Sequence, residues 1–318
     1  HEAPVIQMSV AEVEDWPGAV KKYRLVAVDG ADLPRWTAGA HLDIVVAPEF
    51  LRQYSMCGDP ADRSCYEIAV LQEPEGRGGS QLMHRIFEPG RRVFVSKPIN
   101  HFELEPSAKL SLLFGGGIGV TPMLAFAHEL HRKGGRFRLM YSASQKSKAA
   151  FDGAFDGLAW ADRVSRHYSD QGTRLDIARD VPAYDAGTHI YVCGPDAYMS
   201  AILDHARSIG YPEAALHAEF FTVPELPEWE NHPFEIERAN GQKIPVTARQ
   251  SASDALIAAG IPVDVKCADG LCGVCKCTVL SGEVEHRDFV LSAAQRETTV
   301  ILCQSRAAEA GGVLKLDI

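Results

Sequence analysis

The fold is decided by one short stretch, residues 267–275, which reads Cys-Ala-Asp-Gly-Leu-Cys-Gly-Val-Cys. It sets Cys267, Cys272 and Cys275 in the spacing C-x4-C-x2-C, and Cys303 follows after a long gap. This is the spacing of a plant-type [2Fe–2S] cluster, in which one loop supplies three thiolates and a distant segment supplies the fourth. The small residues of the loop let backbone N–H groups point at the sulfurs, which stabilises a charged cluster. The pattern therefore predicts a metal centre that handles one electron at a time.

Zinc or reduced buried thiols are the alternatives for these four cysteines. Structural zinc sites usually draw on two C-x2-C pairs, and this spacing differs from that pattern. Cys277 is a fifth cysteine, two residues after Cys275. If Cys275 points into the loop, Cys277 begins the next strand, and we expect it to bind no metal.

Length and charge limit the classes of function. The chain has 318 residues, which favours two or three domains over a single core. Its formal net charge of −10 argues against a nucleic-acid partner, because phosphate binding requires a basic face. Eight cysteines in a chain of this length, four of them at metal spacing, indicate a reducing cytoplasm and not a secreted disulfide scaffold.

Two stretches of the chain could be mistaken for targeting or membrane segments. The first residues show no basic start followed by an apolar run, so no signal peptide is expected. Residues 110–127 are apolar over nearly the length of a membrane span. Their glycines and Pro122 instead predict a strand, a tight turn and a buried helix, so no membrane association is expected.

Hydrophobic patterning divides the chain into three segments and a linker. Residues 1–104 alternate as short strands between turns, with one helix at 80–86, as in a small barrel. Residues 105–224 alternate strands and helices, which predicts a parallel sheet. Residues 225–232 have the proline and charge content of a linker. Residues 233–318 begin with a hairpin around Asn240-Gly241 and carry the cysteine loop.

Two strand ends in the middle segment favour a ligand-binding cleft. Residues 115–122 read Gly-Gly-Gly-Ile-Gly-Val-Thr-Pro, after an apolar strand and before a helix. Glycines let the backbone approach a pyrophosphate, and the helix N-terminus offers free N–H groups. The spacing is not the G-x-G-x-x-G fingerprint, so a tight turn without a ligand is the alternative. Residues 193–196, Cys-Gly-Pro-Asp, form a second such end, whose Cys193 is alternatively a small buried hydrophobe.

The first segment carries two further motifs. Residues 52–55 read Arg-Gln-Tyr-Ser, and residues 76–80 read Gly-Arg-Gly-Gly-Ser before a helix. Arginine forks onto phosphate, tyrosine packs on a flat ring, and a glycine turn before a helix binds anions. Each motif by itself also suits a surface ion pair, a strand aromatic or a plain turn.

In this order the motifs resemble the phthalate dioxygenase reductase family, which includes vanillate demethylase reductase subunits. The resemblance spans essentially the whole chain. It implies a multidomain protein with an antiparallel β-barrel that binds FMN, an α/β parallel-sheet NAD-binding domain of the ferredoxin-reductase type, and an α+β plant-type ferredoxin domain of the β-grasp kind.

The resemblance also implies the site residues. The resemblance implies that the flavin is bound by Arg52, Gln53, Tyr54, Ser55, Ala69, Val70, Gly78, Gly79, Ser80 and Gln81. It implies that NADH is bound by Gly116, Gly117, Gly119, Val120, Thr121, Pro122, Cys193, Gly194, Pro195 and Asp196. Ser55, Cys193 and Phe221 are the implied catalytic residues, with Phe221 covering the flavin. Phe220 and Gln72 depart from the family, because basic residues are common at both places.

The implied function is that of an NADH-dependent reductase component of a Rieske-type oxygenase that attacks aromatic rings or removes O-methyl groups. NADH gives two electrons as a hydride and the cluster accepts one, so the flavin stands between them. The expected partner is the terminal oxygenase, and the expected state is a monomer. A cytochrome P450 or another acceptor, and a redox-sensing carrier, are the alternatives. NADPH remains an alternative donor, because a 2′-phosphate could bind to the polar residues after the second strand of the middle segment: Ser142, Ser144, Lys146 and Lys148.

Overall fold

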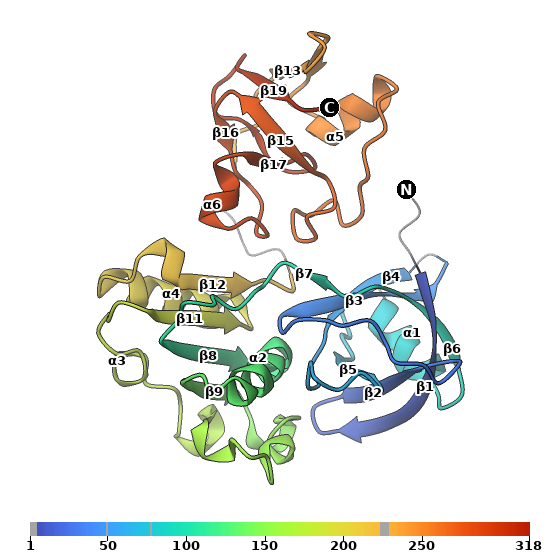
Figure 1. Cartoon of the computed structure of the whole chain (residues 1–318). Coiled ribbons are helices and arrows are strands. Elements are labelled where there is room, and N and C mark those ends of the chain that lie inside the picture. The colour runs from blue at the N-terminus through green and yellow to red at the C-terminus, as the bar shows by residue number, and fades with distance from the viewer. Residues whose placement is uncertain (1–4, 49, 77, 223–228) are drawn as a thin grey trace. The chain divides into compact units, whose positions relative to one another are not determined.

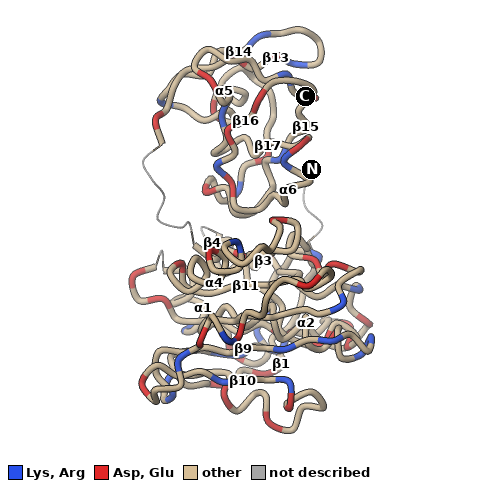
Figure 2. Tube along the Cα trace, turned by 90° about the vertical axis from the view of Figure 1, so that its left-hand side faces the viewer, with Lys and Arg blue, Asp and Glu red and all other residues tan. Residues whose placement is uncertain are grey.

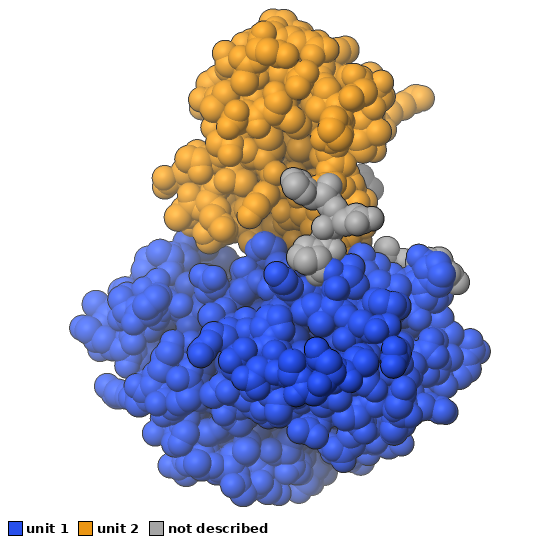
Figure 3. All heavy atoms as spheres, turned by 45° about the vertical axis from the view of Figure 1, so that its right-hand side comes forward, with its two compact units in different colours: residues 1–218 blue, residues 219–318 orange. Residues whose placement is uncertain are grey.

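The computed structural model describes residues 5–48, 50–76, 78–222 and 229–318. It contains two compact units, residues 1–218 and 219–318, coloured separately in Figure 3. Basic and acidic side chains are interspersed along the chain in both units (Figure 2). Arg77 of the Gly-Arg-Gly-Gly-Ser motif and residues 225–228 of the predicted linker lie outside the described residues.

The first part of unit 1 is an antiparallel barrel (Figure 1). Its strands follow the spatial order β4-β3-β6-β1-β2-β5, with β7 paired to β3. An isolated bridge between Met56 and Ile68 links the end of β4 to β5 and closes the sheet. Along β3, buried Leu42 and Ile44 alternate with less buried Asp43 and Val45, which is the pattern of a sheet with one buried face. The elements are β1 (Val5–Trp16), β2 (Val20–Ala27), β3 (Ala40–Ala47), β4 (Phe50–Ser55), β5 (Tyr66–Leu71), α1 (Gly79–Ile86), β6 (Arg92–Ser96) and β7 (Ile99–Asn100).

The second part of unit 1 is a sheet of order β10-β9-β8-β11-β12. The β10–β9, β9–β8 and β8–β11 pairs are parallel, as predicted. β8 is buried along almost its whole length, which is typical of a strand covered on both faces. The strands are β8 (Leu110–Gly116), β9 (Phe137–Ala143), β10 (Val164–Tyr168), β11 (Thr188–Cys193) and β12 (Leu216–Glu219), and the α-helices are α2 (Thr121–Arg132), α3 (Ile177–Asp180) and α4 (Asp196–Ser208). Short 3₁₀ helices lie at Gly117–Val120, Lys146–Lys148, Gly153–Phe155, Ala161–Arg163, Ser169–Gln171 and Glu213–Ala215.

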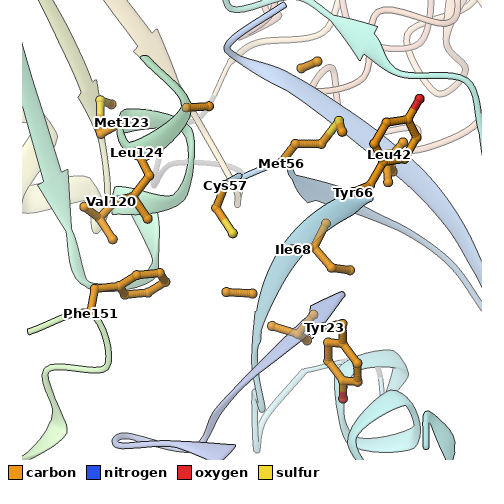
Figure 4. Packing of buried hydrophobic residues seen from close by; sticks show 14 of the residues in the cluster. Tyr23, Leu42, Met56, Cys57, Tyr66, Ile68, Val120, Met123, Leu124 and Phe151 are labelled. Atoms are coloured by element: carbon orange, nitrogen blue, oxygen red, sulfur yellow. The ribbon is translucent and has the colours of Figure 1, made fainter. Parts of the chain in front are cut away.

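One hydrophobic core joins the barrel to the parallel sheet. Cys57 lies between Ile68 of the barrel and Val120 and Leu124, which belong to the turn and helix after β8 (Figure 4). The Glu129 carboxylate on α2 also accepts the Ala38 backbone N–H at 2.9 Å. This shared packing fixes the barrel and the sheet relative to each other.

Unit 2 is a mixed sheet of order β14-β13-β19-β15-β17. The predicted hairpin is present, because β13 and β14 pair antiparallel around Asn240-Gly241, and β13 pairs parallel with β19. A capping box of Ser251 and Asp254 starts the helix α5. The elements are β13 (Phe234–Arg238), β14 (Lys243–Val246), α5 (Ala252–Ala258), β15 (Lys276–Ser281), β16 (Val284–Glu285), α6 (Ala293–Arg296), β17 (Thr299–Ile301), β18 (Arg306–Ala307) and β19 (Val313–Leu316).

The predicted fold class is thus confirmed: an antiparallel barrel, a parallel α/β sheet and an α+β domain with the cysteine loop. The apolar stretch 110–127 is strand, turn and helix, as the glycines predicted. None of the helices in the described ranges is both long and apolar enough to cross a membrane. The boundaries proposed at residues 104, 224 and 232 stay predictions.

Candidate functional site

Arg52 meets the first turn of α1 at one corner of the barrel. A Cβ atom added to Gly79 would lie 2.5 Å from Arg52 Nε, so the guanidinium covers the start of this helix. Gly78, with φ of 80°, takes the left-handed conformation that turns the chain into α1. A guanidinium beside the positive end of a helix is a suitable place for a phosphate group.

Ser80 and Gln81 use their side chains to fix the loop before α1. Ser80 Oγ accepts the Glu73 backbone N–H at 3.0 Å. Gln81 Nε2 donates to the carbonyl oxygens of Glu73 and Pro74, at 3.1 and 2.8 Å. The N–H groups of the first helical turn have no partner within the helix and can serve a ligand.

The remaining flavin-site candidates lie on β4 and β5. Burial raises the pKa of Tyr54 to about 12, so its hydroxyl stays a neutral donor. Ser55 is buried and pairs in register with His41. Gln53 faces the opposite way from Tyr54 and contacts His41 and Asp43, at 3.0 and 3.3 Å. Ala69 and Val70 are buried on β5.

The two strand ends of the parallel sheet meet through glycines. Cys193 pairs in register with Gly115 of the neighbouring strand. A Cβ atom on Gly119 would stand 2.4 Å from the Cys193 carbonyl oxygen. A Cβ atom on Gly116 would stand 2.9 Å from Pro195 Cδ. Only glycine therefore permits this approach of the turn after β8 to the turn after β11.

The residues that follow the glycine turn build its support. Gly117, with φ of 56°, is left-handed, and Val120 is fully buried. Thr121 is buried and donates its hydroxyl to the Ile118 carbonyl at 3.0 Å. Pro122 lies in the first turn of α2, where no hydrogen bond is lost. Asp196 lies in the first turn of α4, where a carboxylate suits the helix dipole.

A pocket of about 470 Å³ opens between the barrel and this sheet edge. Its size is that of a small-molecule site. Val20 and Leu71 line it from the barrel, and Gly116, Gly117 and Pro195 line it from the sheet. The other nucleotide-site candidates do not line it: Gly119, Val120, Thr121, Pro122, Cys193, Gly194 and Asp196.

The sequence did not predict several polar residues that line this pocket at the carboxyl ends of β9 and β10. Tyr198 of α4 also lines it, and so do the polar residues Gln145, His167, Ser169 and Arg174. His167 belongs to β10, which was not predicted as a strand. Recognition of β10 would have placed these residues at the carboxyl edge of the sheet, where ligands bind.

In unit 2 the four predicted cluster cysteines form a chain of contacts. Cys267 contacts Cys272 and Cys303, and Cys303 also contacts Cys275. Hydrogen bonds from the Cys272 and Cys303 thiols lower the pKa of Cys267, which favours the thiolate that binds iron. No group of three or more described His, Cys, Asp or Glu side chains is arranged to hold a single metal ion.

Backbone N–H groups point at these sulfurs, as the glycine-rich loop predicted. Asp269 N lies 3.4 Å from Cys267 Sγ, and the N–H groups of Leu271, Val274 and Gly270 bond to Cys267, Cys272 and Cys303 respectively. Gly270 and Gly273 have positive φ angles of 75° and 68°, which the tight loop requires. The Cys275 thiol also has a backbone hydrogen bond from Cys303, and four thiols supplied with N–H donors suit the [2Fe–2S] cluster.

Three further residues singled out from the sequence are Cys277, Phe220 and Phe221. Cys277 lies on β15, and its thiol contacts the carbonyl oxygens of Thr278 and Asp317. The ring of Phe220 packs on Phe289 at 5.2 Å. Phe221 is 41% exposed.

Similarity to known proteins decides the family. The family model of the 2Fe-2S iron-sulfur cluster binding domain matches residues 236–308. A vanillate O-demethylase oxidoreductase of Pseudomonas sp. (strain HR199 / DSM 7063) is 40% identical over 297 residues, which are 92% of this chain and 93% of the relative. Phthalate dioxygenase reductase of Burkholderia cepacia is 34% identical over 98% of this chain and 97% of the relative. The chain belongs to the oxygenase reductase family.

Solved structures agree with this assignment. The structure of phthalate dioxygenase reductase matches with a TM-score of 0.70 and 33% identity, over 99% of this chain and 98% of that one. An intact type IV self-sufficient cytochrome P450 monooxygenase matches with a TM-score of 0.90 and 34% identity. That match covers 99% of this reductase, which spans 41% of the P450 chain. The chain is therefore an oxidoreductase with a [2Fe–2S] cluster binding domain, as the resemblance implied.

Proposed function

We propose that this reductase passes electrons from NADH through FMN to the [2Fe–2S] cluster and on to a Rieske-type terminal oxygenase. The observation that carries the proposal is the pocket between barrel and sheet, lined by Leu71 beside the flavin candidates and by Gly116 and Pro195. When bound, the flavin accepts a two-electron hydride and releases single electrons. The pocket would hold the nicotinamide against it, as hydride transfer requires.

The chain's own residues bind and orient the two cofactors in this proposal. Arg52 and the first turn of α1 bind the flavin phosphate, while buried Ala69 and Val70 exclude water beside the ring. The neutral Tyr54 hydroxyl donates a hydrogen bond to the flavin. Cys193 shapes the nicotinamide end, because its carbonyl lies so close to Gly119 that a Cβ atom there would be 2.4 Å away.

Phe221 would cover the flavin ring and move aside when the nicotinamide enters. Its side chain is exposed, whereas the ring of the preceding residue, Phe220, packs against Phe289. Phe221→Ala should change both the rate of hydride transfer and the charge-transfer absorbance in stopped-flow experiments. Unchanged values of both would remove Phe221 from the mechanism.

The names of the relatives support an oxygenase as the acceptor. They include vanillate O-demethylase oxidoreductase, phthalate dioxygenase reductase and the reductase subunit of tert-butanol monooxygenase. The test supplies NADH and the reductase to a purified Rieske oxygenase, such as the oxygenase component of vanillate O-demethylase. Product formation that depends on both proteins supports the proposal. Cluster reduction without transfer to any Rieske protein would argue against it.

A cytochrome P450 is the second candidate acceptor. The observation that favours it is the similarity to the self-sufficient P450, over 99% of this chain. Mixing the reduced protein with a P450 haem domain under carbon monoxide reports electron transfer directly. Rapid reduction of cytochrome c by NADH would separate both candidates from a redox-sensing carrier without turnover. We further infer a cytoplasmic location, because the eight cysteines are free thiols.

A further inference from the structure

We propose that the nucleotide pocket accepts a phosphate on the adenosine 2′ oxygen, so that this reductase uses NADPH as a donor beside NADH. The inference rests on the proposed function of the pocket and specifies its substrate class. It is carried by the pocket wall at the carboxyl ends of β9 and β10, where the backbone of Lys148 also lies close to Gly18 of the barrel.

That wall lies at the carboxyl ends of β9 and β10. Ser142 belongs to β9, and Ser144 and Lys148 follow that strand. His167 belongs to β10, and Arg174 follows it. Ligands of open α/β sheets bind outside the carboxyl ends of the strands, so we place the adenosine half of the nucleotide against this wall.

The charge of the wall suits a phosphate. Lys148 and Arg174 line the pocket, and none of its described lining residues is Asp or Glu. In dinucleotide sites a carboxylate accepts hydrogen bonds from the ribose of NAD, whereas an arginine accommodates the 2′-phosphate of NADP. The lining therefore has the cations that NADPH needs and lacks the carboxylate of an NAD-selective site.

The acidic residues nearest in sequence are engaged elsewhere. Asp170 Oδ1 accepts the Lys146 backbone N–H at 3.0 Å. Asp176 accepts the Arg179 backbone N–H and caps α3. Both carboxylates keep their charge, but neither residue lines the pocket, so the charged side chains of the described lining are basic.

His167 supplies a second and independent observation. It is only 8% exposed, and its buried Nε2 has no hydrogen-bond partner among the residues that the structure describes. Its Nδ1 lies 3.1 Å from the Thr173 carbonyl oxygen, which can only accept, so Nδ1 carries a proton. A buried polar atom is rarely left unpaired, and Nε2 therefore points to a ligand. Neutral Nε2 accepts from a ribose hydroxyl, and protonated Nε2 donates to a phosphate oxygen.

Two adenosine nucleotides probe the site directly. The holoprotein is titrated with 2′,5′-ADP and with 5′-AMP, which differ only in the 2′-phosphate. We expect 2′,5′-ADP to bind about 10- to 100-fold more tightly, the range for hydrogen bonds to charged groups. Equal affinities, or tighter binding of 5′-AMP, would overturn the inference.

Steady-state reduction of cytochrome c tests the assigned side chains. Lys148→Gln and Arg174→Gln should each raise KM for NADPH by about tenfold more than KM for NADH, as loss of one charge-assisted contact predicts. Arg138→Gln is the matched control, because Arg138 is an exposed residue of β9 that does not line the pocket. Equal changes of KM for both nucleotides would refute the roles of Lys148 and Arg174. Failure of NADH itself to reduce the flavin would instead refute the proposed function.

Discussion

Gly119 and Cys193 touch through their backbones. A methyl group on Gly119 would stand 2.4 Å from the Cys193 carbonyl oxygen and 2.6 Å from Gly194 N. This contact holds the turn after β8 against the turn after β11, and so shapes the pocket edge where Gly116 and Pro195 meet.

Gly119→Ala should therefore destabilise unit 1 and weaken NADH binding. Overpacking at such a contact costs about 1–3 kcal/mol, which corresponds to a fall in Tm of roughly 2–12 °C. Thermal unfolding and NADH titration measure the two effects. Gly153→Ala is the matched control, because a Cβ atom there meets no atom of the described residues within 4 Å. Equal behaviour of the two variants would show that the contact is unimportant.

Arg52→Gln should weaken FMN binding. Loss of a charge-assisted contact to phosphate costs about 1.5–3 kcal/mol, which raises Kd by about 10- to 100-fold. Quenching of flavin fluorescence on titration of the apoprotein measures Kd. Arg92→Gln, at an exposed position of β6, should bind FMN as the unaltered protein does. A normal Kd for Arg52→Gln would place the phosphate elsewhere.

Cys303→Ser and Cys277→Ser should behave oppositely. Cys303 contacts two of the loop thiols, whereas the Cys277 thiol donates to the backbone carbonyl oxygens of Thr278 and Asp317. The first substitution should abolish the visible absorbance of the cluster, and the second should preserve it. Iron and sulfide analysis of the two variants provides the check. Loss of the cluster in Cys277→Ser alone would overturn the ligand assignment.

Protonation of His217 should lower the stability of unit 1 at acidic pH. Its ring stacks on Tyr191 at 4.5 Å, and burial with nearby His189 lowers its pKa to about 4 from 6.5. The unfolded chain therefore takes up this proton before the folded chain does. Stability contributed by neutral His217 is complete above pH 6.5 and falls progressively as the pH decreases towards 4, by roughly 3 kcal/mol in all.

Urea unfolding at pH 7 and pH 5 measures this dependence. His217→Gln removes the titrating ring, so its stability should fall less between these pH values than that of the unaltered protein. His205→Gln, on α4, serves as a control for the loss of a histidine in the same unit. Identical pH dependence for His217→Gln and the unaltered protein would refute the assignment.

Much of this architecture follows from local sequence signals. Asn240-Gly241 predicted the hairpin of β13 and β14, and the glycine turn before Pro122 predicted the start of α2, because each signal needs only neighbouring residues. The cysteine spacing likewise predicted which four thiols meet.

Elements that depend on distant partners were missed. β10 reads Val-Ser-Arg-His-Tyr and lies at the end of its sheet. Because this strand is short and rich in polar residues, its sequence lacks the apolar pattern that predicts a strand. β19 pairs in parallel with β13, which lies far away in the sequence. Without β10, the sequence could not place His167 and Arg174 at the pocket, although Ser142, Ser144 and Lys148 had been noted.

The most direct test of the account adds NADH to the anaerobic holoprotein and follows flavin absorbance together with the EPR signal of the cluster. The account predicts that the flavin bleaches and that the signal of a reduced [2Fe–2S] cluster then appears. In Cys303→Ser, the flavin should still bleach and the cluster signal should be absent. A cluster that stays oxidised while the flavin is fully reduced, or that is reduced in protein stripped of flavin, would contradict the proposed route of the electrons.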